Sequence, residues 1–329
     1  MKVLYIIGNG FDISLGMKTG YSDFYRYYLS QPSQDNDIAS LKNSIKDKRY
    51  ETWADLEIGL GKYTSSIVSS KVFLKCLNDI RKELKIYLDK QFEERDYFPD
   101  SRKLYEYFAT PHLLLDAQVK SKYESFVRRF EVSYASKNDI SIISLNYTNT
   151  IEDILRGLNT GIQILHLHGT LNDGIVVGVN DQGQIENLLF RSDIDIIESF
   201  VKPEYNDSCL NDKNLNAKSL IERADIIVFF GASLGDSDRM WWRMIGERVV
   251  NPKERVLLVY FPYDKDKDDV VFPNYRRRWN KEYLEKLLNA LDIPAERMIE
   301  AEKKICIGLN KPLFKMDKMP NLPSPSRIR

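Results

Sequence analysis

Short apolar runs without polar alternation most constrain what this chain can fold into. They occupy residues 3–7, 140–145, 162–167, 226–230 and 256–261. A strand of a parallel sheet is covered by helices on both faces, so its sequence is continuously apolar. Helical patterns lie between many of the runs, which favours an α/β, doubly wound fold with a mostly parallel sheet. Ligands of such folds bind beyond the carboxyl ends of the strands, so we expect the motifs that follow the runs to cluster in space.

The region of residues 30–136 interrupts this rhythm, because it contains no convincing strand. Apolar side chains repeat at helical spacing over 73–92 and over 115–130, and the break at 98–101 is typical of an αα-hairpin. We therefore predict a large helical insertion whose aromatic stripe forms a core; a lid over a cleft is the alternative. The predicted division is a core of 1–29 and 137–312, an insertion of 30–136 and an extended C-terminal tail of 313–329.

The first apolar run ends in residues 8–12 (GNGFD), a pattern that indicates a nucleotide site. Gly8 and Gly10 allow the backbone to approach a ligand closely, and N–H groups at such a strand end can face a phosphate. A generic turn explains the same letters. The segment does not fit a P-loop, because five residues separate Gly10 from Gly16 and Met17 precedes the lysine.

The second run is followed by residues 145–152 (LNYTNTIE), which offer two asparagines. Asn149 and Glu152 have the spacing of a capping box at a helix start. Asn146 lies at the strand end, where its amide can bond a sugar hydroxyl or hold a water, or form a structural turn.

The third run carries His166 and His168 on one face of a predicted strand. Two histidines without a nearby carboxylate or cysteine make a poor metal site, so no metal is predicted. His166 fits a satisfied core residue. His168 adjoins Gly169 at the strand end, where an imidazole can act as a general base.

The fourth run continues into residues 231–238 (GASLGDSD) and then into a helix. Gly231, Ser233 and Gly235 permit close approach of a ligand, whereas the acidic residues after them can cap the helix. The pattern G-x-S-x-G also occurs in serine hydrolases, but no histidine follows it here, which excludes that reaction class.

The composition limits which classes of binding partner and which kinds of cysteine site we expect. The 48 Lys and Arg balance 48 Asp and Glu, so no net field attracts nucleic acid or an anionic membrane. The three cysteines are far apart, which suggests neither a zinc ribbon nor a disulfide framework. No apolar run has the length of a signal peptide core or a membrane span, so we expect a cytoplasmic protein.

Five segments together resemble a known family. They are 8–12 with Gly16, Thr19, Tyr21 and Phe24; 53–57 (WADLE); 145–148 (LNYT); 166–169 (HLHG); and 230–238 (FGASLGDSD). In order and context they resemble the AbiH proteins of bacterial abortive infection, which defend against bacteriophage. More distantly, they resemble the sirtuin-like, Rossmann-type NAD-binding fold. The resemblance spans most of the chain.

The resemblance to sirtuin-like enzymes implies roles for these residues. The first loop would hold the NAD pyrophosphate, Asn146 would face the nicotinamide ribose, and His168 would be the catalytic histidine. The implied cofactor-binding residues are Gly8, Asn9, Gly10, Asp12, Thr19, Gly231, Ser233, Asp236 and Asp238. Asp12 can also assist by charge or cap the following helix.

The activity that this resemblance implies is cleavage of the nicotinamide–ribose bond, which depletes NAD in an infected cell. Sirtuin deacylases have a paired-cysteine zinc module and an acyl-lysine channel, and the sequence has neither. A homo-oligomer and a phage-derived trigger are further expectations from the resemblance.

Two other functions are weighed against NAD hydrolysis. One is a nucleotide-binding sensor or regulatory subunit that holds NAD without turnover. It would be favoured if His168 points into the core or if Asn146 is engaged by the backbone. The other is a nuclease-like toxin, which is disfavoured because the sequence lacks an acidic metal cluster and a basic surface.

Overall fold

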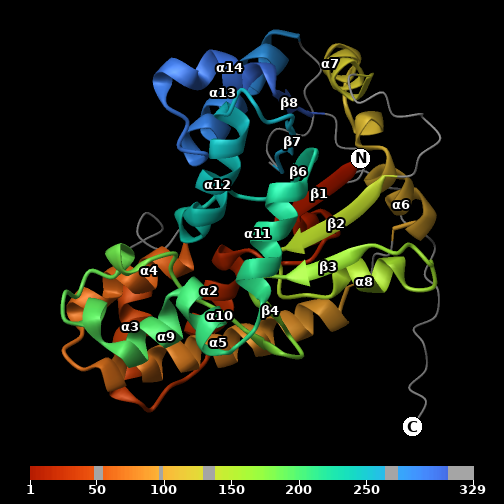
Figure 1. The fold of residues 1–329 in the computed structure, drawn as a ribbon. Coiled ribbons are helices and arrows are strands. Elements are labelled where there is room, and N and C mark those ends of the chain that lie inside the picture. Colours follow the sequence, from red (N-terminus) through yellow and green to blue (C-terminus); the bar gives the residue numbers. More distant parts are fainter. Residues whose placement is uncertain (48–54, 96–98, 129–137, 264–272, 310–329) are drawn as a thin grey trace.

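A six-stranded, fully parallel sheet forms the centre of the computed structural model, which describes residues 1–47, 55–95, 99–128, 138–263 and 273–309 (Figure 1). Its strands are β1 (Lys2–Ile7), β2 (Asp139–Ser144), β3 (Gln163–His166), β6 (Ile226–Phe230), β7 (Leu257–Phe261) and β8 (Ile305–Ile307). The first five coincide with the apolar runs, and the predicted doubly wound α/β fold is confirmed. The β8 strand was not predicted, because three residues are too few for a periodic signal.

The order of the strands, β3-β2-β1-β6-β7-β8, determines where a ligand can bind. Strand β1 pairs with β2 on one side and β6 on the other, and Ile7 lies opposite both Ser144 and Phe230. From β1 at the centre, β2 and β3 are added in turn on one side. The chain then returns to the centre, and β6, β7 and β8 are added in turn on the other side. The loops after β1 and β6 therefore leave the sheet at a topological switch point, the usual position of a ligand crevice.

Helices cover both faces of the sheet, which explains why its strands are apolar throughout. Leu4 and Ile6 of β1 face one layer, whereas Val3, Tyr5 and Ile7 face the other. The first layer contains α11 (Lys213–Arg223), α12 (Arg239–Val250), α13 (Pro273–Ala290) and α14 (Met298–Lys303). The second contains α1 (Gly10–Ser14), α6 (Ser101–Ala109), α7 (Ala117–Arg128) and α8 (Thr150–Leu155).

A helical lobe with its own apolar core lies beside the carboxyl edge of the sheet (Figure 1). It comprises α2 (Tyr21–Ser30), α3 (Asn36–Asp47), α4 (Leu56–Tyr63), α5 (Ser70–Glu93), α9 (Ile194–Phe200) and α10 (Lys202–Ser208). The short strands β4 (Gly169–Thr170) and β5 (Gly174–Ile175) connect β3 to it. The described residues also include short 3₁₀ helices: η1 (Thr64–Ser66), η2 (Pro111–Leu114), η3 (Gln182–Gln184), η4 (Phe190–Ser192), η5 (Asp236–Asp238) and η7 (Ala295–Arg297).

The predicted αα-hairpin is wrong, although both of its helical stretches exist. Helix α6 lies between them, and α5 packs into the helical lobe whereas α7 packs near β8 on the sheet. Helical periodicity identifies the face that is buried but not the surface that buries it. The domain division stays a prediction, and the tail of 313–329 lies outside the described residues.

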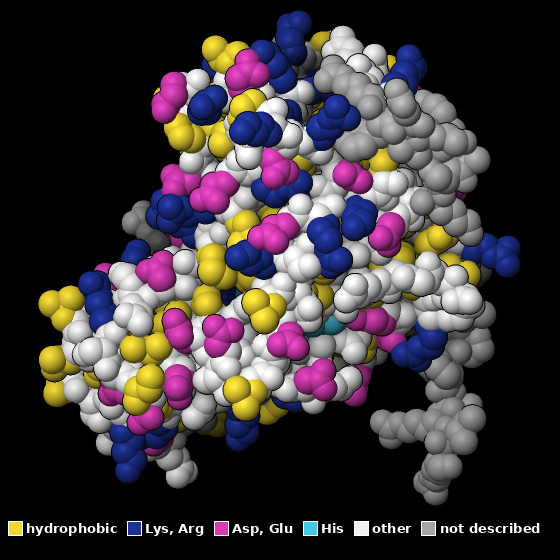
Figure 2. Space-filling view, viewed as in Figure 1, with side chains coloured by type: hydrophobic (Ala, Val, Ile, Leu, Met, Phe, Trp, Pro, Cys, Tyr) yellow, Lys and Arg dark blue, Asp and Glu magenta, His cyan; other side chains and the backbone are white. Residues whose placement is uncertain are grey.

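Charge on the surface is mixed, as the composition suggests. Figure 2 shows Lys and Arg interspersed with Asp and Glu over one face of the molecule. Among the described helices, none combines the length and the apolar character needed to cross a membrane.

Glycines hold the two central loops together at the switch point. The Gly8 N–H donates to the Phe230 carbonyl at 3.0 Å, and the Gly10 N–H donates to the Gly231 carbonyl at 2.8 Å. A Cβ on Gly8 would lie 2.6 Å from Cα of Ala232, and one on Gly10 would lie 2.8 Å from Cα of Gly231. The loops touch backbone to backbone, which only residues without a side chain permit.

Replacing Gly231 with alanine tests this contact. Its φ is +63°, and a Cβ would lie 2.7 Å from the Phe11 nitrogen. Gly161→Ala is the matched control, because Gly161 has φ +66° with no atom within 4 Å of the added Cβ. We expect Gly231→Ala to lose about 2 kcal/mol more stability than Gly161→Ala in urea unfolding, since overpacking adds to the shared backbone cost. Equal losses would contradict the loop contact.

Candidate functional site

A cleft of about 530 Å³ opens at the carboxyl ends of the strands, between the sheet and the helical lobe. Most of the residues singled out from the sequence line it: Gly8, Asn9, Gly10, Asp12, Thr19, Asn146, His168, Gly231, Ser233 and Asp238. Asp236 is not among the lining residues; its side chain is exposed and its carbonyl accepts a hydrogen bond from Gln184. Motifs that are far apart in sequence thus share one crevice.

The first loop is held by its own polar groups. The Asn9 amide donates to the Thr19 carbonyl at 2.9 Å, and the Thr19 hydroxyl donates to Oδ1 of Asn9 at 2.5 Å. The N–H groups of Gly8 and Gly10 are already paired with the β6 loop. In this arrangement Asn9 and Thr19 fix the shape of the loop, and those two glycine N–H groups are not free for a phosphate.

Asp12 is a buried carboxyl group in the wall of the cleft, with 1% of its surface exposed. Its Oδ2 accepts a hydrogen bond from the Thr148 hydroxyl at 2.5 Å, whereas its Oδ1 is buried without a partner. Burial raises the pKa of Asp12 from 3.8 to about 6, against the opposing effect of the threonine hydrogen bonds. A carboxyl group with this pKa is partly ionised near neutrality and can accept or release a proton.

Asn146 is anchored to the first loop, because its Nδ2 donates to the Gly8 carbonyl at 3.2 Å. A carbonyl can only accept, so the amide nitrogen must face Gly8 and the amide oxygen points the other way. The backbone carbonyl of Asn146 in turn contacts Nδ1 of His166 at 3.0 Å. Asn146 is thus engaged by the backbone through one half of its amide.

His166 is a satisfied structural residue, as the sequence suggested. Its Nε2 lies 2.6 Å from Oε1 of Glu152, and although burial opposes this, the carboxylate raises the pKa of His166. The predicted capping box is wrong, because the Asn149 side chain makes no cap hydrogen bond and Glu152 is occupied by His166. Residue spacing alone could not reveal that competing partner.

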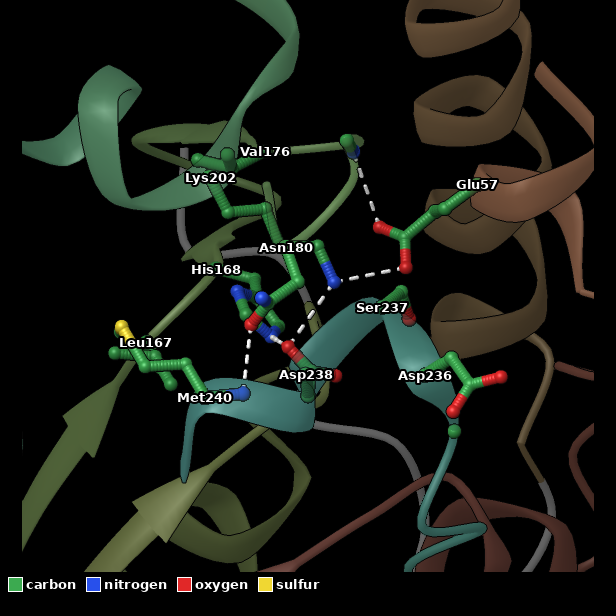
Figure 3. Close-up of polar contacts among 12 residues, drawn as sticks. Glu57, Leu167, His168, Val176, Asn180, Lys202, Asp236, Ser237, Asp238 and Met240 are labelled. Carbon is green, nitrogen blue, oxygen red and sulfur yellow. Dashed lines mark hydrogen bonds and ion pairs between the residues drawn. The ribbon is translucent and has the colours of Figure 1, made fainter. Parts of the chain in front are cut away.

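His168 lines the cleft beside three ionisable side chains, Glu57, Lys202 and Asp238 (Figure 3). Its Nε2 is 2.9 Å from Oδ1 of Asp238, outside good hydrogen-bond angles, and its Nδ1 is buried without a partner. The same Asp238 oxygen lies 3.1 Å from the ammonium of Lys202, which also contacts Glu57 at 2.8 Å. The other Glu57 oxygen accepts from the Gly178 N–H. Elements of the lobe and the sheet thus meet at one ion cluster.

The electrostatics of this cluster follow from burial and proximity. Burial and the Lys202 charge lower the pKa of His168, so its imidazole is neutral at pH 7. Burial raises the pKa of Glu57 to about 7, although Lys202 opposes this. Burial alone would also raise the pKa of Asp238, but Lys202 and His168 outweigh burial and hold this pKa below its ordinary value. Asp238 is therefore the ionised partner of Lys202.

Comparison with known proteins identifies the family. A model described as Bacteriophage abortive infection AbiH matches residues 4–260, more than half of the chain. The chain belongs to the AbiH family. Membership gives it a role in abortive infection, a bacterial defence against bacteriophage. No curated protein matches the chain. The AbiH match covers β2, β3, β6 and the carboxyl half of β1, and the loops that follow these strands line the cleft.

Two cleft residues of this AbiH protein were not recognised as functional candidates from the sequence. Glu57 appeared only within the 53–57 segment, of which residues 53 and 54 lie outside the described residues. Lys202 carries no sequence signal, because one lysine before a proline resembles an ordinary helix start. Asp238, predicted to bind the cofactor, lines the cleft and also lies within ion-pair distance of Lys202 and His168.

The pH dependence of stability tests the burial of Asp12. An acid whose pKa is raised on folding stabilises the protein fully below its unfolded pKa and loses this contribution as pH rises through its folded pKa. Between pH 4 and 7 we expect wild type to lose about 2.4 kcal/mol relative to Asp12→Asn, which mimics the protonated acid. Urea unfolding at each pH measures this.

Asp195→Asn is the control, because Asp195 is exposed on α9. Its stability difference from wild type should stay constant within about 0.5 kcal/mol. A similarly flat difference for Asp12→Asn would contradict the raised pKa.

Proposed function

We propose that this AbiH protein binds NAD in the cleft and hydrolyses its nicotinamide–ribose bond, depleting NAD in an infected cell. One observation carries the proposal: four separate motifs converge on a single cleft at the switch point of a doubly wound sheet. These are the segments that resemble the NAD-binding loops of sirtuin-like enzymes. A cleft of about 530 Å³ also lies within the usual size of cofactor sites.

The proposed reaction breaks the bond between C1′ of the ribose and the nicotinamide nitrogen. The bonding electrons move to the ring, which leaves as neutral nicotinamide, and the sugar gains oxocarbenium character. Water then bonds to C1′ and gives its proton to a base, which yields ADP-ribose. The protein must stabilise positive charge, hold the ribose and accept one proton.

Three cleft residues suit these tasks. The Asn146 amide oxygen, which faces away from Gly8, can accept a hydrogen bond from a ribose hydroxyl. The neutral imidazole of His168 can accept the proton at its unpartnered Nδ1. Asp12, with its unpartnered Oδ1, can stabilise the cationic sugar or serve as an alternative base.

A second candidate function is a sensor that binds a nucleotide without turnover. Two observations favour it: the Asn146 amide is bonded to the Gly8 backbone, and only 4% of the His168 surface is exposed. Hydrolysis then requires the ligand to reach an imidazole that is largely covered in this structure. Sensor and hydrolase share the same cleft and differ only in product formation.

Incubation of purified protein with NAD separates the two functions. Chromatography would follow nicotinamide and ADP-ribose, and calorimetry would measure NAD binding. For the hydrolase we expect nicotinamide release that falls at least about 100-fold in Asn146→Ala and His168→Ala, since each group acts on the reacting atoms.

His112→Ala is the matched control, because this third histidine packs against Tyr123 of α7 and does not line the cleft. It should keep wild-type activity. Binding of NAD without nicotinamide release would favour the sensor. Neither binding nor release would contradict both functions.

A further inference from the structure

The cations that line the cleft are few. Among the described lining residues they are Lys202 and Lys286, whereas four acidic residues line the same cleft: Asp12, Asp55, Glu57 and Asp238. A nucleotide brings at least one phosphate, whose charge needs a cation or free N–H donors. Which cation is available is therefore decisive for binding.

Lys202 is not available. Its ammonium is bonded to Glu57 and Asp238, and 5% of its side chain is exposed. Removing it from these partners would leave two buried carboxyl groups beside one another, a change that costs several kcal/mol. The paired N–H groups of Gly8 and Gly10 do not substitute for it.

Lys286 is available. It belongs to α13, one turn after Tyr283, and both residues line the cleft at the end of β7. Its side chain is exposed, and within the described part of the chain no carboxylate forms an ion pair with it. On the same helix, Lys281 pairs with Glu285 at 3.7 Å. Among the described lining residues, the unpaired cation thus lies one turn from Tyr283, whose ring packs against Tyr260 of β7. In the strand order, β7 is on the far side of β1 from β3, which precedes His168.

We propose that Lys286 binds the phosphate group of the ligand that enters this cleft. The carboxylates at the His168 end repel a phosphate, and the ammonium at the β7 end attracts it, so the charges give the ligand one orientation. The inference rests on the proposed function only for the identity of the nucleotide. The claim that is independent of the proposed function is that binding of a phosphorylated ligand in this cleft depends on Lys286.

Calorimetric titration of Lys286→Ala tests this, with Lys281→Ala as the matched control. The probes are NAD, ADP and adenosine, each titrated at low and high salt. We expect Lys286→Ala to weaken NAD and ADP about tenfold and to leave adenosine unchanged, because one charge-assisted contact is lost. Added salt should weaken wild type more than Lys286→Ala. The Lys281→Ala variant should match wild type with every probe.

Failure of this inference can be told from failure of the proposed function. If NAD binds wild type and Lys286→Ala equally, Lys286 is not the phosphate contact, and NAD binding stands. If NAD fails to bind but ADP binds in a Lys286-dependent way, the inference stands and the proposed function is wrong. If neither phosphorylated probe binds wild type, both are overturned.

Discussion

The backbone contact between the loops after β1 and β6 is the constraint on which the cleft depends. Two hydrogen bonds join Gly8 and Gly10 to the β6 strand end, and neither loop has room for a side chain there. The switch point is closed at its base by this contact, so the crevice above it is a fixed feature of the fold. Asn146 adds a third link to the Gly8 carbonyl and brings the loop after β2 to the same point.

A buried ion cluster then joins the helical lobe to this crevice. Glu57 of α4, Lys202 of α10 and Asp238 of η5 meet beside His168, so lobe and sheet share charges that neither could bury alone. Burial and the Lys202 charge keep the His168 imidazole neutral, against the opposing effect of Asp238. Its cost in desolvation is a reason to expect that the arrangement serves the site as well as stability.

Prediction from sequence succeeded where a signal is local. Unbroken apolar runs gave the central strands, and their endings gave Gly8, Asn146, His168 and Gly231 as neighbours. Prediction failed where the contact of a side chain or helix depends on a residue distant in sequence. Glu152 contacts His166 instead of capping its helix, and α7 packs on the sheet instead of on α5. Lys202 shows the same limit, because its importance arises from carboxylates 145 and 36 residues away.

The central claim is that the cleft between the glycine loops and the helical lobe is the ligand site of this AbiH protein. A crystal structure of the protein with ADP-ribose tests it most directly, since ADP-ribose carries both the phosphates and the ribose without the cleavable bond. The account predicts electron density in this cleft, beside the loops after β1 and β6, with the terminal ribose near Asn146 and His168. Density at another surface, with this crevice empty, would contradict it.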